Sequence, residues 1–443
     1  MTDILLINPP CDSWLSKVTE VQPIGLCLIA SALIKEGYEV KILDSIIEEK
    51  DEEKTVEDIK KINPRFVGLY TTSGQIKTCL SIAKKLKPLN IKTIFGGPFI
   101  SFLPEIFNMY DCFDYAFIGE GEVSFPKFFK EISNCKDNKR RIEYGGFVED
   151  LNKSPLPAFD LLPMKKYYSP FKHGNFCITL SSRGCPYNCI YCSHHSKVRV
   201  RSTDNMIEEL KILNDKYKVK WIQFSDDIFT INRERTLELC KKIIKEEFNF
   251  YWQCQTRIEH IDKELLKLMY KAGCRTIGFG IESANESTRK LLGKGNISNE
   301  NIEKNRKLCK EANIEFFMNL MIGLPDETLE DMKKSVEFAI KIDADYMLPH
   351  CTVAYPYTKL FEMGLQKGIL YPKIWYDYVK DKAPLPNFVE KYLTIKEIKK
   401  AQGEAFKQFF LRPKYIIKRL RKIETFGDIS QNFHSAISLP FKQ

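Results

Sequence analysis

Short apolar runs alternate with amphipathic stretches through the first 140 residues. Stretches such as 25–36 and 75–86 repeat apolar residues every three to four positions, the period of a helix with one buried face. Five runs of β-branched and aliphatic residues are predicted strands: 4–8, 39–43, 66–70, 93–95 and 115–118. Because strands and helices alternate with short links, we expect an α/β fold here, a Rossmann-like (flavodoxin-like) doubly wound parallel sheet.

A second alternating series begins near residue 171. Its predicted strands are 178–181, 221–224, 251–255, 276–280, 315–321 and 346–353. Its predicted helices are 205–217, 233–246, 263–272, 301–312 and 329–340. Six strand–helix units predict a partial (β/α)6 barrel of the TIM type, because a full barrel of eight units needs about 250 residues.

The segments between and after the two series have their own character. Residues 141–170 hold adjacent glycines and several prolines with little periodicity, which is typical of a linker. Residues 393–423 form a helical pattern that is interrupted at Pro413. The predicted parts are therefore a domain at 1–140, a linker at 141–170, a barrel at 171–375 and a small helical, basic C-terminal region at 376–443.

Composition indicates a globular protein. The 443 residues are 44% hydrophobic and 28% charged, which excludes disorder as the dominant state. Asp3 stands where a signal peptide carries basic residues, and nowhere do about 18 apolar residues follow one another. We therefore expect a cytoplasmic protein whose 14 cysteines are ligands, redox thiols or buried side chains rather than disulfides.

The net charge of +10 is concentrated at one end of the chain. Residues 376–443 contain 14 basic and 7 acidic residues, and so carry +7 of that total. A polyanion-binding surface over the whole chain is therefore not expected, and the charge gives no reason to expect nucleic acid as a substrate.

Small and turn-forming residues follow the predicted strands of the first domain at their carboxyl ends, where doubly wound sheets bind ligands. They are Asn8-Pro9-Pro10, Thr71-Thr72-Ser73-Gly74, Gly96-Gly97-Pro98 and Gly119-Glu120-Gly121-Glu122. Glycines at such positions let a ligand approach backbone N–H groups closely.

Three cysteines stand close together after the first predicted strand of the second series: Cys185, Cys189 and Cys192. Thiolates at this spacing can bind three irons of an iron–sulfur cube and leave the fourth iron open for chemistry. The alternative is a structural zinc site completed by His194 or His195. The other eleven cysteines show no paired spacing, and we predict that most of them are core residues.

The segment Cys185-x-x-x-Cys189-x-Tyr191-Cys192 resembles the signature of the radical S-adenosylmethionine (SAM) superfamily. From about residue 3 to 422 the chain resembles the subgroup with an N-terminal cobalamin-binding domain. Two glycine-rich loops, at 96–98 and 119–122, are similar to cobalamin-domain loops. The segments similar to later motifs of the subgroup are Phe224-Ser225-Asp226-Asp227-Ile228-Phe229, Gln255-Thr256-Arg257, Gly280-Ile281-Glu282-Ser283, Gly323-Leu324-Pro325-Asp326-Glu327-Thr328 and Phe410-Leu411-Arg412-Pro413-Lys414-Tyr415.

The resemblance implies an enzyme in which a [4Fe-4S] cluster on the three cysteines reductively cleaves SAM. The product is a 5′-deoxyadenosyl radical that abstracts hydrogen from the substrate, while the protein orients and shields the cofactor. The implied SAM contacts are Tyr191 near the adenine, Ser225, Asp226 or Asp227 at the methionine ammonium, Glu282 and Ser283 at the ribose, Gly323 to Pro325 at the adenine, and Arg257.

Each of these residues also has a structural interpretation. Asp226 and Asp227 would cap the helix that follows, and Glu282 would do so through Ser283. Residues 323–325 would form a plain turn before the next helix. Arg257 would be an ion-pair partner inside the barrel.

The resemblance also implies that the first domain binds cobalamin. The residues expected to contact it are Thr72, Ser73, Gly74, Gly96, Gly97, Gly119, Glu120 and Gly121. The first histidine of the chain is His173, so this domain has no histidine to bind cobalt from below. We predict cobalt without a histidine ligand from the first domain, and the alternative is a domain that no longer binds cobalamin.

Basic and apolar residues interleave in the C-terminal region. The basic residues are Lys407, Arg412, Lys414, Lys418, Arg419, Arg421 and Lys422. One interpretation is an interfacial helix that makes peripheral membrane contact. The favoured interpretation is a helix that packs its apolar face on its own barrel.

The function expected from the resemblance is methylation of an unactivated carbon in a small-molecule or natural-product substrate. One SAM would methylate cobalt and a second would supply the radical, with flavodoxin or ferredoxin as low-potential electron donor. The alternative within the class is radical cyclisation, rearrangement or oxidation without methyl transfer. The alternative outside it is a non-catalytic zinc- or cofactor-binding protein.

Overall fold

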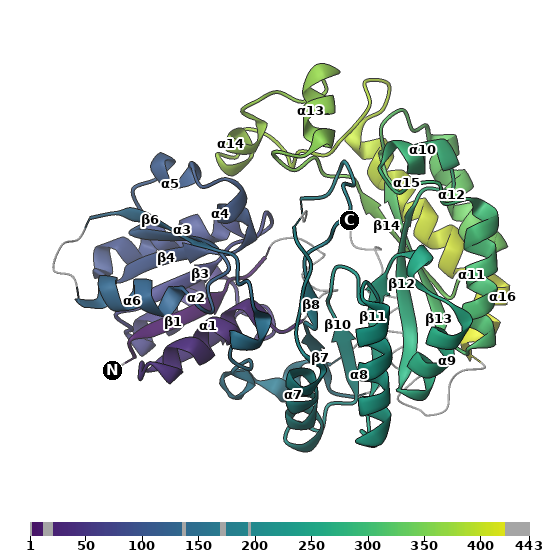
Figure 1. Cartoon of the computed structure of the whole chain (residues 1–443). Coiled ribbons are helices and arrows are strands. Elements are labelled where there is room, and N and C mark those ends of the chain that lie inside the picture. The colour runs from purple at the N-terminus through teal and green to yellow at the C-terminus, as the bar shows by residue number, and fades with distance from the viewer. Residues whose placement is uncertain (1, 12–20, 135–138, 169–173, 194–195, 421–443) are drawn as a thin grey trace. The chain divides into compact units, whose positions relative to one another are not determined.

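The computed structural model describes residues 2–11, 21–134, 139–168, 174–193 and 196–420 (Figure 1). These residues form two compact units. Unit 1 contains the described residues of Met1–Tyr168 together with Asn175–Ile178, and unit 2 contains those of Ser169–Gly174 and Thr179–Gln443. The domain boundaries expected from the sequence stay a prediction.

Unit 1 is built on a six-stranded parallel sheet in the order β2-β1-β3-β4-β5-β6. The strands are β1 (Ile4–Asn8), β2 (Val40–Asp44), β3 (Phe66–Tyr70), β4 (Lys92–Gly96), β5 (Tyr115–Gly119) and β6 (Arg141–Gly146). This order and the intervening helices confirm the predicted doubly wound sheet. Strand β6 corrects the sequence interpretation, which had placed residues 141–146 in a linker.

The reason for that difference lies at Gly145. A Cβ at this residue would lie 2.4 Å from the Phe117 ring, so a glycine is needed where β6 packs over its neighbour. At the edge of the sheet β6 is also only partly covered, and Tyr144 is exposed. The strand therefore lacks the apolar run that marked the other five.

Helices cover both faces of this sheet. On one face α1 and α6 pack together with strand residues in an apolar core that includes Leu33, Phe66, Phe117 and Phe129. The contact between α2 and α3 is on the other face. The helices of unit 1 are α1 (Ile24–Lys35), α2 (Glu52–Ile62), α3 (Ile76–Leu86), α4 (Pro98–Phe102), α5 (Ile106–Met109) and α6 (Phe125–Asn134).

Unit 2 is built on a curved six-stranded sheet in the order β14-β13-β12-β11-β10-β7, whose edge strand β7 begins within the residues Asn175–Ile178 that are grouped with unit 1. The strands are β7 (Phe176–Thr179), β10 (Trp221–Phe224), β11 (Tyr251–Thr256), β12 (Cys274–Glu282), β13 (Glu315–Ile322) and β14 (Tyr346–Cys351). The predicted partial barrel is thus confirmed. Strand β7 ends two residues before the predicted strand does, because the Ser181 N–H donates to Asp226 instead of joining the sheet.

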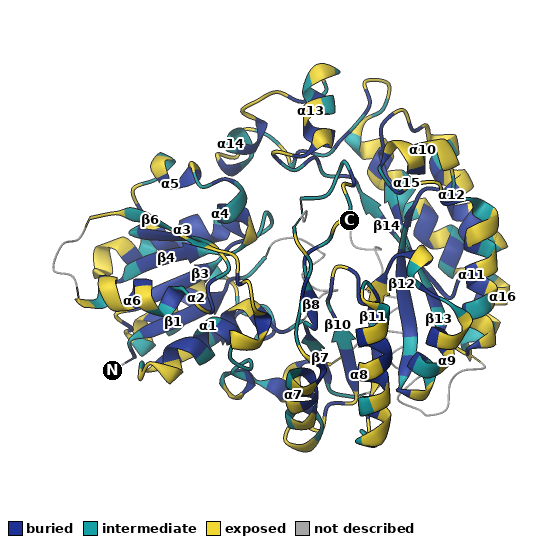
Figure 2. Ribbon diagram, viewed as in Figure 1, coloured by how far each residue is buried: buried dark blue, intermediate teal, exposed yellow. Residues whose placement is uncertain are grey.

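Helices line the outer face of the curved sheet, with exposed outer surfaces and buried inner ones (Figures 1 and 2). They are α7 (Thr203–Asp215), α8 (Arg233–Lys245), α9 (Lys263–Lys271), α10 (Glu286–Leu291), α11 (Asn299–Glu311) and α12 (Leu329–Lys341). Strand residues facing these helices are apolar and buried, among them Trp252, Phe279 and Phe316. The rigid layer fixes the strand ends that carry the candidate site.

The chain continues through α13 (Lys359–Gln366), α14 (Ile374–Val379), α15 (Ile395–Phe410) and α16 (Pro413–Leu420). Phe406 and Phe409 are buried, and Arg419 bridges Glu315 at 3.2 Å and the Tyr346 hydroxyl at 2.6 Å. The C-terminal helices therefore pack on their own barrel. Arg421 and Lys422 lie outside the described residues. Across the described part of the chain, no helix is both long and apolar enough to cross a membrane.

Candidate active site

The three cysteines lie on a loop that a short hairpin closes at its base. Strand β8 (Ser182–Arg183) pairs antiparallel with β9 (Arg199–Val200) on either side of the loop. Cys185 and Cys192 are partly exposed and Cys189 is 7% exposed. Gly184 has φ +94°, and a Cβ there would lie 2.4 Å from the Lys197 carbonyl oxygen, so the turn into the loop needs glycine.

Backbone contacts dock the cysteine loop on two other parts of unit 2. The Ile190 N–H donates to the Leu292 carbonyl at 3.1 Å, and the Leu360 N–H, in the first turn of α13, donates to the Ile190 carbonyl at 2.9 Å. Gly293 lies directly against the loop, because a Cβ there would be 2.9 Å from the Asn188 carbonyl oxygen. The loop is therefore held in place by main-chain groups, and its thiols lie where β7 has ended.

Asp226 and Asp227 clamp the start of the same loop. The Asp226 carboxylate accepts hydrogen bonds from the Ser181 N–H and the Ser182 hydroxyl, both at 2.7 Å. Burial raises the pKa of Asp226. Asp227 is exposed and accepts from the Gly184 N–H at 2.9 Å. The helix-capping interpretation of this pair is wrong.

Asn232 caps the next helix, α8, and neither aspartate contributes to that cap. Ser225 lies just before the clamp and is half-buried, and its hydroxyl oxygen accepts from the Gln223 side chain at 3.3 Å. Contact of these three residues with the methionine ammonium of SAM stays a prediction.

A buried charged pair stands beside Tyr191. Lys294 Nζ and Glu282 Oε1 are 2.8 Å apart, and both side chains are 8% exposed. The Tyr191 hydroxyl donates to the same Glu282 oxygen at 2.8 Å. A Cβ on Gly280 would lie 2.5 Å from Glu282 Oε1 and 2.9 Å from Lys294 Nζ, so glycine is what makes room for the pair.

Glu282 itself has φ +67°, a left-handed conformation that costs free energy for any residue with a side chain. It does not cap the following helix, because Asn285 is the cap of α10. Ser283 is fully buried, and its hydroxyl accepts from the Asn285 N–H at 3.2 Å. The capping interpretation of Glu282 is therefore wrong, and the ribose contacts of Glu282 and Ser283 stay a prediction.

The turn after β13 is organised by a buried carboxyl group. Gly323 has φ +80°, and the N–H groups of Gly323 and Leu324 donate to Glu327 Oε2 at 2.9 and 3.0 Å. Burial raises the pKa of Glu327 to about 7. Pro325 is buried in the same turn. The turn before α12 is thus as the structural interpretation expects, and its predicted contact with adenine is not tested.

Arg257 lies against the cysteine loop. Its guanidinium NH1 is 3.8 Å from Cys189 Sγ, and its NH2 pairs with Glu259 at 2.8 Å. Arg257 is therefore an ion-pair partner, as the structural interpretation expects, but Glu259 is exposed rather than inside the barrel. The contact with Cys189 is additional to this ion pair.

In unit 1 the residues expected to contact cobalamin lie at the carboxyl edge of the sheet. Backbone hydrogen bonds join neighbouring loops there, such as that from the Thr71 N–H to the Gly96 carbonyl at 2.8 Å and from the Glu120 N–H to the Gly146 carbonyl at 2.9 Å. Gly121 is buried and Gly119 is exposed. The others are half-buried: Thr72, Ser73, Gly74, Gly96, Gly97 and Glu120.

Beneath this edge lies a buried polar network that sequence reasoning did not predict. The Asn8 side chain donates to Asp44 at 2.9 Å, and Gln75 donates to Asn8 at 2.9 Å. The Tyr167 hydroxyl donates to Asp44 at 2.6 Å, and burial raises the pKa of this carboxyl. The network fixes the loops that follow β1, β2 and β3. Its sequence signal is weak, because the four residues are far apart in the chain.

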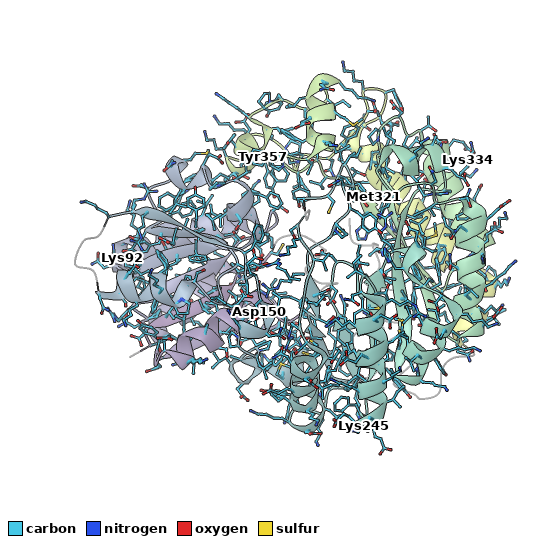
Figure 3. All side chains as sticks on the ribbon, in the orientation of Figure 1. Lys92, Asp150, Lys245, Met321, Lys334 and Tyr357 are labelled. Carbon is cyan, nitrogen blue, oxygen red and sulfur yellow. The ribbon has the colours of Figure 1, made fainter. Side chains whose placement is uncertain are left out.

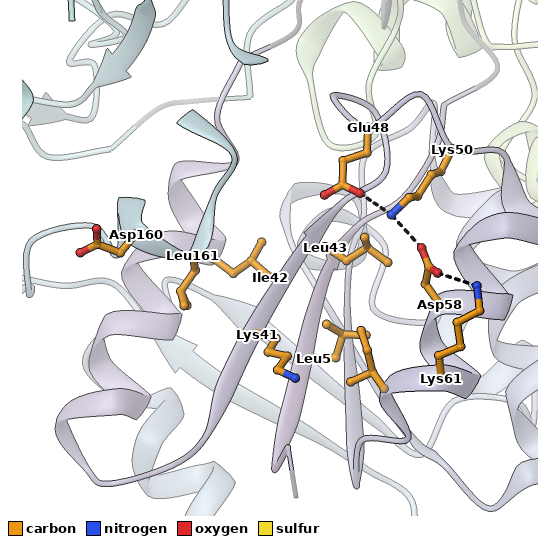
Figure 4. A pocket seen from close by; sticks show the side chains of 11 residues that line it. Leu5, Lys41, Ile42, Leu43, Glu48, Lys50, Asp58, Lys61, Asp160 and Leu161 are labelled. Atoms are coloured by element: carbon orange, nitrogen blue, oxygen red, sulfur yellow. Dashed lines mark hydrogen bonds and ion pairs between the residues drawn. The ribbon is translucent and has the colours of Figure 1, made fainter. Parts of the chain in front are cut away.

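A groove of about 590 Å³ lies beside the edge strand β2 in unit 1 (Figure 4). Its charged side chains pair with one another, since Lys50 contacts both Glu48 and Asp58. The described residues that line it include none of those predicted to bind a cofactor. It therefore gives no support to a second cofactor site.

Comparison with known proteins decides the family. Residues 179–339 match the radical SAM superfamily and residues 16–129 match the B12-binding domain. The chain is 32% identical over 437 residues to an uncharacterized methyltransferase of Pyrococcus horikoshii, covering 94% of each chain. The chain belongs to the B12-binding radical SAM family.

Two further proteins are similar to this radical SAM chain. One is the anaerobic magnesium-protoporphyrin IX monomethyl ester cyclase of Rubrivivax gelatinosus, 25% identical over 81% of this chain and 69% of the cyclase. The other is the radical SAM methyltransferase TsrM of Kitasatospora setae, whose structure contains tryptophan and a SAM analogue. The superposition of the two structures has a TM-score of 0.67 at 18% sequence identity, and it covers 82% of this chain and 76% of TsrM. The second likeness confirms the α/β fold.

The donor set of this radical SAM chain fits an iron–sulfur cluster. Three thiols lie on one docked loop, and the buried Nε of Arg257 has no hydrogen-bond partner among the described residues. That donor lies beside Cys189, where a cluster would offer sulfur acceptors. The zinc alternative requires His194 or His195, which lie outside the described residues. Among the residues described, no three His, Cys, Asp or Glu side chains meet closely enough to hold a single metal ion.

The edge of the B12-binding unit likewise fits a large planar cofactor. The edge is formed by glycines and short polar residues, and a Cβ added at Gly146 would meet no atom within 4 Å. No histidine occurs before His173. The residues present therefore fit a corrin held without a histidine from this unit.

Sequence reasoning did not single out four residues of the radical SAM unit that the structure brings to the site: Tyr187, His260, Lys294 and Glu327. Lys294 had a usable signal, since it stands between two glycines and is separated from Glu282 only by the short helix α10. Glu327 was within a quoted motif. Tyr187 and His260 meet only through the fold, their hydroxyl oxygen and Nε2 being 2.6 Å apart. Figure 3 shows the side chains of both units, with Met321 of β13 labelled.

Proposed function

We propose that this protein is a cobalamin-dependent radical SAM methyltransferase that methylates an unactivated carbon of a small molecule. The observation that carries the proposal is the docked Cys185, Cys189 and Cys192 loop beside the buried Glu282–Lys294 pair. The match of residues 16–129 to the B12-binding domain supports the second cofactor. The similar Pyrococcus protein is named a methyltransferase, which supports the reaction type.

When bound, the cluster supplies the electron that splits SAM and cobalamin supplies a carrier for a methyl group. The chain's own residues bind and orient. The three thiols would hold three irons of the cluster and leave the fourth open to SAM. Lys294 offers a positive charge for the methionine carboxylate and Glu282 offers acceptors for ribose hydroxyls. Because both side chains are 8% exposed, their interactions are screened little by water.

The residues Ser225, Asp226 and Asp227 form part of the same proposal. Asp226 is fully occupied by the serines of the loop, whereas Asp227 is exposed and Ser225 half-buried. Of the three, Asp227 and Ser225 are the better placed to receive the methionine ammonium. Tyr191 and residues 323–325 are assigned to the adenine.

The cellular setting follows from the chemistry. A cluster on three thiolates would need a reducing compartment, and none of the thirteen described cysteines forms a disulfide, so we place the enzyme in the cytoplasm. A flavodoxin or ferredoxin is the class of electron donor that reaches the required low potential. We assign no nucleic-acid substrate and no membrane attachment, since α15 and α16 pack on the barrel through Phe406 and Phe409.

The alternative is a radical reaction without methyl transfer, and the similarity to a cyclase supports it. The decisive experiment uses anaerobically purified protein with hydroxocobalamin, a reductant and SAM labelled in its methyl group. Candidate substrates are taken from the chemistry encoded by neighbouring genes. Label in the product supports methylation. Conversion of the substrate without label would replace methylation by the alternative.

A further inference from the structure

Arg257 follows β11 and begins the turn into the short helix Ile258–His260. Its side chain is 8% exposed and reaches the cysteine loop, where NH1 lies 3.8 Å from Cys189 Sγ. The NH2 group is held by the Lys294 carbonyl and by Glu259, each at 2.8 Å. The guanidinium thus has one end fixed by oxygen atoms and the other against a cysteine sulfur.

The middle of the same side chain carries an unused donor. Arg257 Nε is buried and makes no hydrogen bond within the described residues. Leaving a buried donor of a charged group unpaired is costly, so such an atom in a native site indicates a missing acceptor. The neighbouring sulfur of Cys189 locates that acceptor at the cluster position.

An aromatic platform fixes the plane of the guanidinium. The Arg257 Cζ atom lies 3.8 Å from the centroid of the Tyr187 ring, a close cation–π contact. The Tyr187 hydroxyl is 2.6 Å from His260 Nε2, so a hydrogen bond at the edge of the ring fixes its position. Tyr187 comes from between two of the cysteines, so that the platform is part of the cluster loop itself.

From this arrangement we propose that Arg257 raises the reduction potential of the cluster, as a positioning and electrostatic residue rather than a contact of SAM. The proposal rests on cluster binding by Cys185, Cys189 and Cys192. One-electron reduction adds a negative charge to the cluster, with the electron taken from an external low-potential reductant. A fixed positive charge and N–H donors to sulfur stabilise the reduced form. Arg257 would thereby make the cluster easier for the donor to reduce.

The test is a redox titration of the cluster followed by electron paramagnetic resonance, with dithionite as reductant and neither SAM nor cobalamin present. We expect Arg257→Gln to lower the equilibrium constant for reduction at least tenfold, which is about 59 mV for a one-electron couple. Arg257→Lys keeps the charge but loses the planar group, so we expect a smaller fall in the equilibrium constant for reduction.

The matched control is Arg306→Gln. Arg306 is 5% exposed and pairs with Asp345 at 3.1 Å, at the end of the strands opposite to the cysteine loop. Its replacement removes a buried arginine from the same unit without touching the cluster. We expect the cluster of Arg306→Gln to have the same midpoint potential as the cluster of the unsubstituted protein.

A second readout separates this role from SAM binding. On the oxidised, cluster-loaded protein, Arg257→Gln is expected to change the dissociation constant of SAM less than threefold. A tenfold weaker SAM complex with an unchanged midpoint would overturn the proposal. So would an unchanged midpoint in Arg257→Gln with four irons per chain.

If Arg257→Gln does not retain its cluster, the midpoint potential of Arg257→Lys decides. A potential below that of the unsubstituted protein supports the proposal, and an equal or higher potential overturns it. Failure of both variants to retain iron, with full iron in Arg306→Gln, would also overturn the proposal, because the residue would then serve cluster retention. Since the titration contains no substrate, a failed methyl-transfer assay leaves it unaffected. An unsubstituted chain without iron would instead contradict the proposed function itself.

Discussion

The Tyr191 hydroxyl donates a hydrogen bond to Glu282 across 91 positions of sequence, at 2.8 Å. This bond joins the cysteine loop to the end of β12, and Lys294 adds its charge to the same carboxylate oxygen. The loop that would hold the cluster and the groups that would hold SAM are therefore one connected assembly.

The buried pair gives the first prediction. Lys294→Met leaves the Glu282 charge unpaired and is expected to cost about 3 kcal/mol of unfolding free energy and to weaken SAM binding at least tenfold. The double variant Glu282→Gln with Lys294→Met should recover most of the stability but none of the SAM affinity. Denaturant unfolding and equilibrium SAM binding check this. Lys290→Met, at an exposed lysine nearby, is the control, and normal SAM affinity in Lys294→Met would contradict the assignment.

The proposed cluster gives the second prediction. Replacing Cys185, Cys189 and Cys192 together by alanine should remove iron, sulfide and 5′-deoxyadenosine formation, because three thiolates hold three irons. The control is Cys309→Ala, at a fully buried cysteine on α11, which should keep about four irons per chain. Iron and sulfide analysis after anaerobic purification is the measurement. Stoichiometric zinc in the unsubstituted protein would contradict the cluster assignment.

The pKa of Glu327 gives a prediction of pH dependence. Burial raises this pKa from 4.5 to about 7, so the folded state binds the proton more tightly than the unfolded state. Its stabilising effect is full below about pH 4.5 and is lost as pH rises towards 7. Relative to Glu327→Gln, the unsubstituted chain should lose about 3 kcal/mol of stability between pH 4.5 and 8.

Tryptophan fluorescence is a suitable measurement, because Trp221, Trp252 and Trp375 all lie in unit 2. Denaturant unfolding is followed at several pH values for both proteins. A free-energy difference between them that stays constant with pH would show that Glu327 is ionised in the folded state throughout.

The C-terminal helices give the fourth prediction. Arg419→Ala leaves Glu315 without its arginine and Tyr346 without its donor, and should cost about 2 kcal/mol of unfolding free energy. Binding to anionic vesicles should be as weak as before the substitution. Lys414→Ala, at an exposed lysine of α16, should change neither quantity. Strong flotation of the unsubstituted protein with vesicles would revive the membrane interpretation.

The absence of histidine from the first 172 residues gives the fifth. After reconstitution with hydroxocobalamin, desalting and reduction, the Co(II) form should give a paramagnetic resonance spectrum without nitrogen splitting from a histidine. Loss of all corrin on desalting would end the assignment of cobalamin. Because the dimethylbenzimidazole of cobalamin also splits the signal, a split spectrum would show a histidine ligand from residue 173 onward only if the splitting changes when the protein is labelled with 15N.

The sequence predicted the elements of the fold well because their apolar periods are strong. Strand β3 and helix α8 were placed within one residue at each end, whereas β6 was missed because its glycines and exposed Tyr144 carry no apolar run. The cysteine loop was predictable because its residues are adjacent in sequence. Among the partners of that loop, Arg257 and Glu282 were expected at the site only through the resemblance. Lys294 was not predicted at all, since all three reach the loop only through the curvature of the barrel.

The bond from Tyr167 to Asp44 bears on how the B12-binding part can be isolated for study. The family match ends at residue 129, and the predicted domain ended at 140. A fragment cut at either point would lack strand β6 and Tyr167. The buried Asp44 carboxylate would then lose one of its hydrogen-bond donors. A fragment that keeps this bond and strand β6 therefore extends at least to Tyr168, some forty residues beyond the end of the match to the B12-binding domain.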